Sequence, residues 1–481
     1  MDAAVTPARR LADLPGPRGL PLLGNALQLE RRRFHQQLEG WRQRYGDVYR
    51  LRIGRREFVV FSDPDVIAAA LRDRPRTFGR SERIVSVSQE AGFGGLFASN
   101  GERWRRQRPM VMAAFDPGHI RGYFPSLVRV AHRFAGRWQR AAQANAAIDL
   151  QADLMRYTVD VIAGLAFGVD INTLECEGDV IQQHLDQVFP ALARRGLAMF
   201  PYWRYVKLPS DRRVQRHLDA LRIAVRDFIA QARDRLQANP ALREQPSNLI
   251  EAMLAARERP GSGVDDGDLS GNVLTMLLAG EDTTANTLAW MIYLLSRHPQ
   301  ALQRARSEVR AALGDDRVPT RLEQLAALDW VEACAHETMR LKPVAPILPL
   351  QAFADTMLAG VAIPAGTTCV FLLRVAATEE TYFPQPRQFE PARWLKAGSD
   401  AAGADNNSVR RIAMPFGAGP RMCPGRYLAL LEIKMAIAMV LGGFEIESVT
   451  TPDGGEAAQE RLAFTMSPVG LTLKLRPRAI A

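Results

Sequence analysis

Residues 416–425 read Phe-Gly-Ala-Gly-Pro-Arg-Met-Cys-Pro-Gly, and Cys423 lies in this stretch between two glycines. The glycines, together with Pro420 and Pro424, exclude a continuous helix or strand, so the segment is expected to be an irregular loop. A helical pattern resumes over residues 426–443. The sequence therefore places a cysteine in a loop directly in front of a helix.

Cys423 has the surroundings of a metal-binding thiolate. A thiolate donates electron density to haem iron and thereby favours cleavage of an O–O bond. Backbone N–H groups that donate to the sulfur lower its basicity. Because Pro424 has no N–H, we expect these donors to begin at Gly425. Gly419 and Gly425 would leave room for a flat macrocycle, and the helix that starts near Arg426 would direct its positive end toward the sulfur. Taken alone, a cysteine is more often a small buried apolar side chain.

The spacing F-x-x-G-x-R-x-C-x-G is formed by Phe416, Gly419, Arg421, Cys423 and Gly425. It resembles the ligand loop of the cytochrome P-450 family, the haem-thiolate monooxygenases. The resemblance implies a haem b cofactor whose iron takes Cys423 as its axial ligand. It covers almost the whole chain and is closest to the branch of microsomal enzymes and bacterial fatty-acid hydroxylases.

The pattern along the chain predicts one large domain, residues 1–481, that is mainly α with small β-sheets (α+β). Periodicity is mostly helical from about 101 to 340 and changes to short strands and loops after 343. Residues 47–61 predict a hairpin, and residues 1–25 an extended leader rich in proline and glycine. The resemblance places the haem between a long central helix and the cysteine loop.

The segment AGEDTT begins at Ala279, inside the long helix expected over about 269–296. Acidic and hydroxyl side chains are costly inside an apolar helix unless they are used. By resemblance, dioxygen and haem lie against Ala279 and Gly280. The hydroxyl of Thr283 would orient a proton-relay water, and Asp282 would deliver protons from solvent. An exposed polar stripe is the alternative for such a segment taken alone.

Glu337 and Arg340 lie one helical turn apart and can form an ion pair. Such pairs are common and mean little alone. Downstream, residues 389–394 read FEPARW and resemble a family segment whose arginine, here Arg393, completes a buried Glu–Arg–Arg cluster. The role implied for this cluster is structural, to hold the loop that presents Cys423.

Trp104 and Arg108 are spaced to share one helix face. They resemble a W-x-x-x-R motif that anchors one haem propionate, with Arg421 on the other side. The family often has a further arginine about ten residues after its E-x-x-R motif. Leu350 stands there in this chain, which places one propionate contact in doubt.

The formal charge is +10, but 57 of the 62 basic residues are arginine, and no polybasic tail supports nucleic-acid binding. An acidic protein partner fits this charge better. About 58 residues follow Cys423, too few for a reductase domain. We therefore expect a separate ferredoxin- or flavodoxin-type donor, reduced with NAD(P)H and docking at a patch that includes Arg103, Arg105 and Arg106.

The four cysteines have no metal-ligand or disulfide spacing, which favours a reducing compartment. Residues 1–19 lack the apolar core that is typical of a signal peptide. The longest uncharged run, from Thr356 to Leu373, is interrupted by Gly360, Pro364 and Gly366, so strands are expected rather than a membrane span. We expect a soluble cytoplasmic monomer.

The resemblance implies insertion of one oxygen atom from O2 into a C–H bond. A peroxygenase or isomerase that needs no electron donor, and a non-catalytic haem sensor, are the alternatives; the pair Asp282-Thr283 argues against both. The segments expected to line the substrate pocket are apolar, aromatic and methionine-containing, which favours a lipophilic substrate such as a fatty acid or terpenoid. They are residues 83–95, 190–205, 276–279, 343–349 and 464–466.

Overall fold

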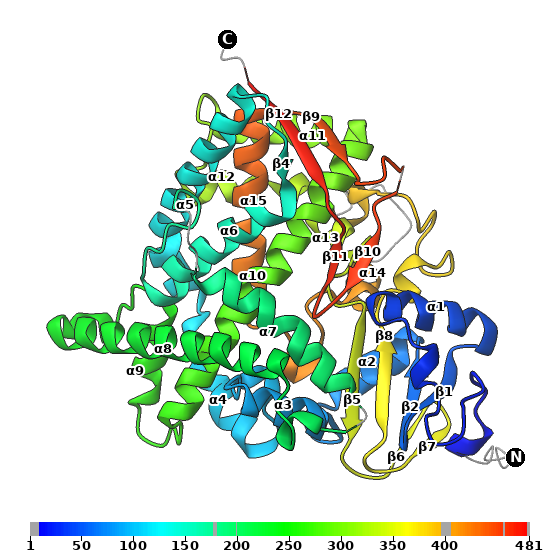
Figure 1. Cartoon of the computed structure of the whole chain (residues 1–481). Helices are drawn as coiled ribbons and strands as arrows, with labels where there is room; N and C mark the ends of the chain where they lie inside the picture. The colour runs from blue at the N-terminus through cyan, green and yellow to red at the C-terminus, as the bar shows by residue number, and fades with distance from the viewer. Residues whose placement is uncertain (1–8, 177–179, 199, 396–405, 456, 479–481) are drawn as a thin grey trace, which may run out of the picture.

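The computed structural model describes residues 9–176, 180–198, 200–395, 406–455 and 457–478 (Figure 1). Most of the described chain is helical, as predicted. The helices are α1 (Phe34–Tyr45), α2 (Pro64–Arg72), α3 (Glu82–Glu90), α4 (Gly101–Ala114), α5 (Pro117–Gln143), α6 (Leu150–Ile162), α7 (Val180–Leu197), α8 (Pro209–Ala238), α9 (Leu249–Arg257), α10 (Asp266–Arg297), α11 (Pro299–Leu313), α12 (Leu322–Ala326), α13 (Asp329–Leu341), α14 (Asn406–Ala413) and α15 (Arg426–Gly443).

The long helix α10 runs through the centre of the helical part and packs against α6, α8, α11, α13 and α15 (Figure 1). Its residues are apolar on nearly every side, as expected of a helix surrounded by others. It begins at Asp266, three residues before the predicted start. The reason is a cap, because Oδ1 of Asp265 accepts a hydrogen bond from the N–H of Asp268 at 2.6 Å.

Small sheets cover one side of the molecule (Figure 1). The largest has the strand order β1-β2-β8-β5-β3, and its β1–β2 hairpin is the one predicted from the sequence; only the β2–β8 pair is parallel. A three-stranded sheet β4-β12-β9 and the hairpins β10–β11 and β6–β7 complete the set. The strands are β1 (Val48–Ile53), β2 (Arg56–Phe61), β3 (Phe78–Gly79), β4 (Ile148–Asp149), β5 (Ile347–Ala352), β6 (Thr356–Leu358), β7 (Val361–Ile363), β8 (Thr368–Leu372), β9 (Phe444–Thr450), β10 (Glu460–Leu462), β11 (Met466–Pro468) and β12 (Thr472–Pro477).

The N-terminal leader follows the sheet as irregular backbone. Arg9 bridges to Val361, and Gly24 bridges to Ile53 at the end of β1. One 3-10 turn, η1 (Leu11–Asp13), interrupts the extended path that the sequence predicted, and residues 1–8 lie outside the described residues. Among the described helices, none combines the length and the apolar composition needed to cross a membrane.

Candidate functional site

A cavity of about 1760 Å³ lies between α10 and the loop that carries Cys423. Most of its wall is apolar, with contributions from α3, α4, α7, β5 and the β10–β11 tip. Cys423 lines one side, and Ala279 and Thr283 of α10 also face this space. The structure thus brings the cysteine loop and the polar segment of α10 to the same cavity.

The Cys423 loop is held by its own backbone. The N–H of Cys423 donates to the carbonyl oxygen of Phe416 at 3.0 Å, and α15 starts three residues later at Arg426, as predicted. Burial raises the pKa of the Cys423 thiol, whereas the N–H of Gly425 donates to the sulfur and lowers it. The charges of Arg108 and Arg426 also favour the thiolate. The donor expected at Gly425 is therefore present.

Gly419 also has a packing role that the sequence did not predict. Its φ is +70°, and a Cβ there would come within 2.4 Å of the carbonyl oxygen of Leu71, in α2. Glycine is therefore required for close packing of the loop against α2. Gly280 similarly allows α10 to pass α6, because a Cβ there would lie 2.8 Å from Cδ1 of Ile162.

Three arginines gather beside the Cys423 loop without carboxylate partners. Burial lowers the pKa of Arg421 to about 9, with the charges of Arg74 and Arg108 adding to the effect. Burial also lowers the pKa of Arg74 to about 10 and acts in the same direction on Arg80. Among the described residues no acid forms an ion pair with Arg74, Arg80 or Arg421, and Arg74 Nε is buried with no hydrogen-bond acceptor. Buried cations of one sign require an anion nearby, so this wall fits an anionic group.

Trp104 and Arg108 lie on the same face of α4 and both line the cavity. The Arg421 guanidinium lies over the Trp104 ring, 5.2 Å from its centroid. Arg108 donates from Nη2 to the carbonyl oxygen of Met422 at 2.9 Å, so it also contacts the cysteine loop itself. Leu350 is fully buried in an apolar cluster with Phe371 and does not line the cavity.

The polar segment of α10 is held by hydrogen bonds within the helix and by one from the β10–β11 hairpin. Thr283 Oγ1 donates to the carbonyl oxygen of Ala279 at 2.7 Å, within the helix. The Asp282 carboxylate accepts from Nδ2 of Asn286 at 2.7 Å and from Oγ1 of Thr465 at 2.5 Å. Burial raises the pKa of Asp282, and these two hydrogen bonds and the charge of Arg461 oppose it.

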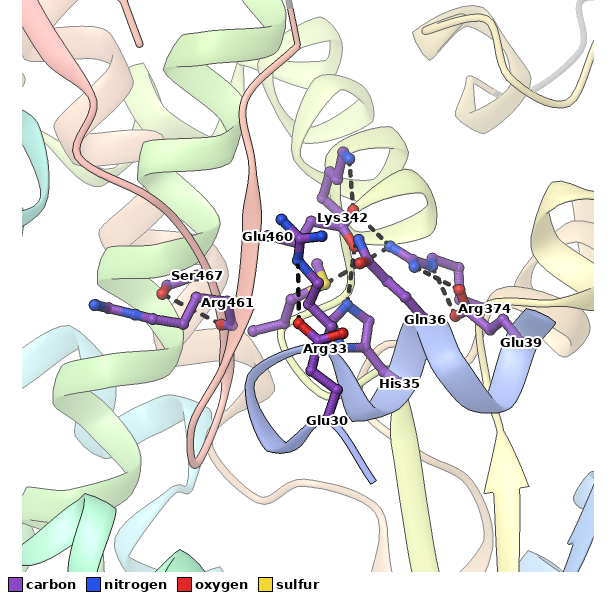
Figure 2. A network of polar contacts seen from close by, with 11 residues as sticks. Glu30, Arg33, His35, Gln36, Glu39, Lys342, Arg374, Glu460, Arg461 and Ser467 are labelled. Carbon is purple, nitrogen blue, oxygen red and sulfur yellow. Dashed lines mark hydrogen bonds and ion pairs between the residues drawn. The ribbon is translucent and has the colours of Figure 1, made fainter. Parts of the chain in front are cut away.

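Thr465 lies at the tip of the β10–β11 hairpin. Glu460, at the start of β10, holds the base of that hairpin (Figure 2). One Glu460 oxygen accepts from Lys342 Nζ at 2.6 Å and Arg374 Nη1 at 2.7 Å, and the other contacts His35 and Gln36. These contacts keep the pKa of Glu460 below its usual range despite burial. The network connects α1 and α13 to the hairpin that reaches Asp282.

Glu337 and Arg340 are completely buried and form two hydrogen bonds, 2.7 and 2.8 Å long. Arg393 Nε lies 3.5 Å from Oε1 of Glu337, at ion-pair distance but without a hydrogen bond. The second close partner of Glu337 is Trp394, whose Nε1 donates to Oε2 at 2.9 Å. The cluster ties α13 to the segment that precedes the cysteine loop, because Arg340 also donates to the carbonyls of Ala377, Pro386 and Gln388.

The family model of cytochrome P450 matches residues 14–475. The chain belongs to the cytochrome P450 family. It is therefore a haem-thiolate P450 monooxygenase that binds haem through a cysteine. Cytochrome P450 97B2 of Glycine max, a chloroplastic protein, is 28% identical over 91% of this chain and 82% of its own length.

A second relative is the cyclooctat-9-en-7-ol 5-monooxygenase of Streptomyces melanosporofaciens, 28% identical over 93% of this chain and 92% of its own length. The crystal structure of the cytochrome P450DA haem domain superposes with a TM-score of 0.84 and covers 98% of this chain and 99% of that chain at 24% identity. That likeness supports the P450 haem-domain fold.

The residues present fit a haem. Its two propionates are anions, and the wall formed by Arg74, Arg80 and Arg421 is cationic, with no ion pair to an acid in the described parts of the chain. Arg74 and Arg80 were not recognised from the sequence, because their motif-free segment approaches Arg421 only in the fold. Arg74 and Arg80 together provide positive charge that could replace the arginine expected at the position of Leu350.

Two more residues that the sequence analysis missed border the cavity. Glu432 of α15 has its pKa raised to about 8 by burial, against a hydrogen bond from Thr284. Thr465 contacts Asp282 although the two lie 183 positions apart. No local pattern marks either residue, since each gains its role only through contacts between distant segments.

Proposed function

We propose that this P450 hydroxylates a lipophilic substrate, with Cys423 as the axial ligand of the haem iron. The haem, when bound, supplies activation of O2 for insertion of one oxygen atom into a C–H bond. The observation that carries the proposal is the shared cavity, onto which the Cys423 thiol and the Asp282-Thr283 pair both open. One wall therefore has the ligand and the facing wall has groups that handle protons.

Proton delivery falls to α10. Thr283 faces the cavity with a hydroxyl that can orient a water molecule, and Asp282 can accept a proton from the solvent side and release it inward. Burial holds the pKa of Asp282 above its usual value, which favours the protonated carboxyl more than exposure to water would. The other parts of this wall, Ala279 and Gly280, carry no titratable group.

The substrate is proposed to be lipophilic because most of the remaining lining surface is apolar. Uncharged apolar side chains from α3, α7, α10, β5 and the β10–β11 tip face the cavity. They are Val87, Leu192, Met276, Ile347 and Phe464. Met199, within the segment 190–205 expected to line the pocket, lies outside the described residues.

Electrons are proposed to come from a separate acidic donor. Two exposed arginines can attract such a partner: Arg72 of α2, which packs against the cysteine loop, and Arg411 of α14, which precedes that loop and lies 3.5 Å from Asp65. The patch expected on α4 is smaller than predicted. Arg103 is occupied by the buried carboxylate of Asp268 at 2.8 Å, and Arg105 forms an exposed ion pair with Glu102 at 3.2 Å. Of these three arginines, only Arg106 forms no ion pair with an acid among the described residues. All four cysteines are free thiols, which supports a reducing compartment such as the cytoplasm.

The test is oxygenation under ¹⁸O2 with a ferredoxin, its reductase and NADPH, using lipophilic compounds first selected by their shift of the Soret band. One ¹⁸O atom in the product, and no product when the donor is omitted, is the expected result. Full turnover with hydrogen peroxide alone would replace the proposal with a peroxygenase. Absence of any oxygenated product, despite a normal haem spectrum, would leave the sensor alternative.

A further inference from the structure

Two of the seven histidines of the chain face each other across a pair of helices. His184 belongs to α7 and His217 to α8, 33 positions later. Their Nδ1 atoms lie 2.7 Å apart, and the ring centroids are 4.9 Å apart in an edge-to-face arrangement. Both side chains are half-buried, and α7 and α8 pack against each other (Figure 1). Two helices, and no loop, therefore hold the two imidazoles in place.

The two facing nitrogens can serve as metal ligands. A hydrogen bond between them requires a proton on one Nδ1 and a bare lone pair on the other. When the donor ring adopts its other tautomer, with the proton on Nε2, both Nδ1 atoms become available to one metal ion. Neutral imidazole is the commonest metal ligand among side chains. Ligands fixed on helices are also placed more precisely than ligands on loops.

The separation of the two nitrogens selects the kind of ion. A bond from a metal ion to a histidine nitrogen is about 2.0–2.1 Å long. Two such bonds at a right angle place the nitrogens about 2.8–3.0 Å apart, close to the 2.7 Å observed. A tetrahedral ion such as Zn²⁺ would need about 3.3–3.4 Å. Square-planar and tetragonal sites are typical of Cu²⁺ and Ni²⁺, so the geometry favours these two ions.

We propose that His184 and His217 bind one Cu²⁺ or Ni²⁺ ion through their Nδ1 atoms, and that this ion joins α7 to α8. In the described part of the chain no third His, Cys, Asp or Glu completes a metal-binding group, so water fills the remaining positions. The ion restrains one wall of the cavity, because α7 also carries the lining residues Leu192 and Ala193. The inference is independent of the proposed function, since neither histidine lines the cavity.

The test is calorimetric titration of the haem-loaded protein with Ni²⁺, Cu²⁺ and Zn²⁺ in a buffer that does not coordinate metals. Every protein carries Cys176→Ser, which removes an exposed thiol that would bind these ions. We expect one Ni²⁺ or one Cu²⁺ to bind, each displacing the other, and Zn²⁺ to bind more weakly than either. Zn²⁺ that binds as tightly as Cu²⁺ would contradict the right-angle geometry.

The variants His184→Gln and His217→Gln should each weaken binding of both ions at least about tenfold, because either change leaves a single ligand. His132→Gln removes an exposed histidine on α5 and should leave binding unchanged. No binding to the parent would mean that the two histidines form a hydrogen bond only. Loss in only one of the two variants, or an equal loss in His132→Gln, would also overturn the inference.

Hydrogen exchange tests whether the ion joins the helices. Bound Ni²⁺ should slow exchange of the backbone amides in both α7 and α8 of the parent, because local opening then has to break a metal–ligand bond. The same Ni²⁺ concentration should have no such effect in His184→Gln or His217→Gln. Protection that is absent, or that is confined to one helix, would contradict a shared ion.

Discussion

The hydroxyl of Thr465 donates to Oδ2 of Asp282 at 2.5 Å, although the two residues are 183 positions apart. Asn286 donates to the other carboxylate oxygen from the next turn of α10. The carboxylate is thereby held toward the β10–β11 hairpin. Since burial raises the pKa of Asp282 and these hydrogen bonds lower it, the hairpin takes part in setting the ionisation of the acid proposed to deliver protons.

Thr465→Val should therefore raise the pKa of Asp282 further, because it removes a donor to the carboxylate without changing the volume much. The limb of the rate–pH profile that requires ionised Asp282 should move to higher pH, and turnover at neutral pH should fall about tenfold. Thr465→Ser keeps the hydroxyl and should behave like the parent. The measurements are kcat against pH and product formed per NAD(P)H oxidised. An unshifted profile in the valine variant would contradict the role given to the hairpin.

Glu432 predicts a pH dependence of stability. Its pKa is raised from 4.5 to about 8 in the folded protein, so the unfolded chain releases this proton at lower pH than the folded chain does. The contribution of Glu432 to stability is therefore lost as pH rises through that interval. Glu432→Gln should be more stable than the parent at pH 8, by about 1–3 kcal/mol, and the gap should close toward pH 5.

Chemical unfolding of the Glu432 variant at several pH values would check this. Glu447→Gln, at a partly exposed strand position, is the control and should show a flat difference. A stability gap that widens on acidification would mean that Glu432 is ionised in the folded protein.

Arg340→Met should destabilise the protein by about 3–5 kcal/mol, because it leaves the Glu337 carboxylate buried without its closest cation. The change also removes donors from the carbonyls of Pro386 and Gln388. Arg76→Met breaks an exposed pair with Asp73 at the same i,i+3 spacing and should cost no more than about 0.5 kcal/mol. Denaturant midpoints measure both; similar losses in the two variants would show that burial of the cluster does not set its energy.

Much of the fold follows from local sequence patterns. The α15 helix, the β1–β2 hairpin and the Glu337–Arg340 pair each depend on residues close together in the chain, and each was predicted. The start of α10 was placed three residues late because Asp265 was not recognised as its cap. Such local patterns can be recognised because the residues that form them lie within a few positions of one another.

The polar contacts around the cavity instead join residues that lie far apart in the chain. Arg74 approaches Arg421 only because α2 packs against the cysteine loop, where Gly419 meets the carbonyl of Leu71. Glu460 accepts hydrogen bonds from Lys342, Arg374 and Gln36, which belong to three distant parts of the chain. A single residue outside any motif gives no indication of its distant partners. The sequence therefore predicted the Cys423 loop but not the charged side chains that surround it.

Arg74→Met should have opposite effects on the two forms of the protein. Without haem it should raise thermal stability, because it removes a buried charge that repels Arg421. With haem it should weaken retention by about 1.5–3 kcal/mol, the value of a hydrogen bond to a charged group. Thermal unfolding of the haem-free protein and transfer of haem to a haem-free globin measure the two effects. Unchanged haem retention would show that Arg74 does not contact a propionate.

The central claim is that Cys423 alone provides the thiolate. Burial raises the pKa of Cys334, and that of Cys369 to about 12, so both remain thiols, whereas Cys423 has the Gly425 N–H and two arginines beside it. The most direct measurement is the Soret band of the ferrous–carbon monoxide protein. The parent and the serine variants of Cys176, Cys334 and Cys369 should show the strongly red-shifted band of thiolate ligation, and Cys423→Ser should lose it. A red-shifted band that persists in Cys423→Ser would contradict the account.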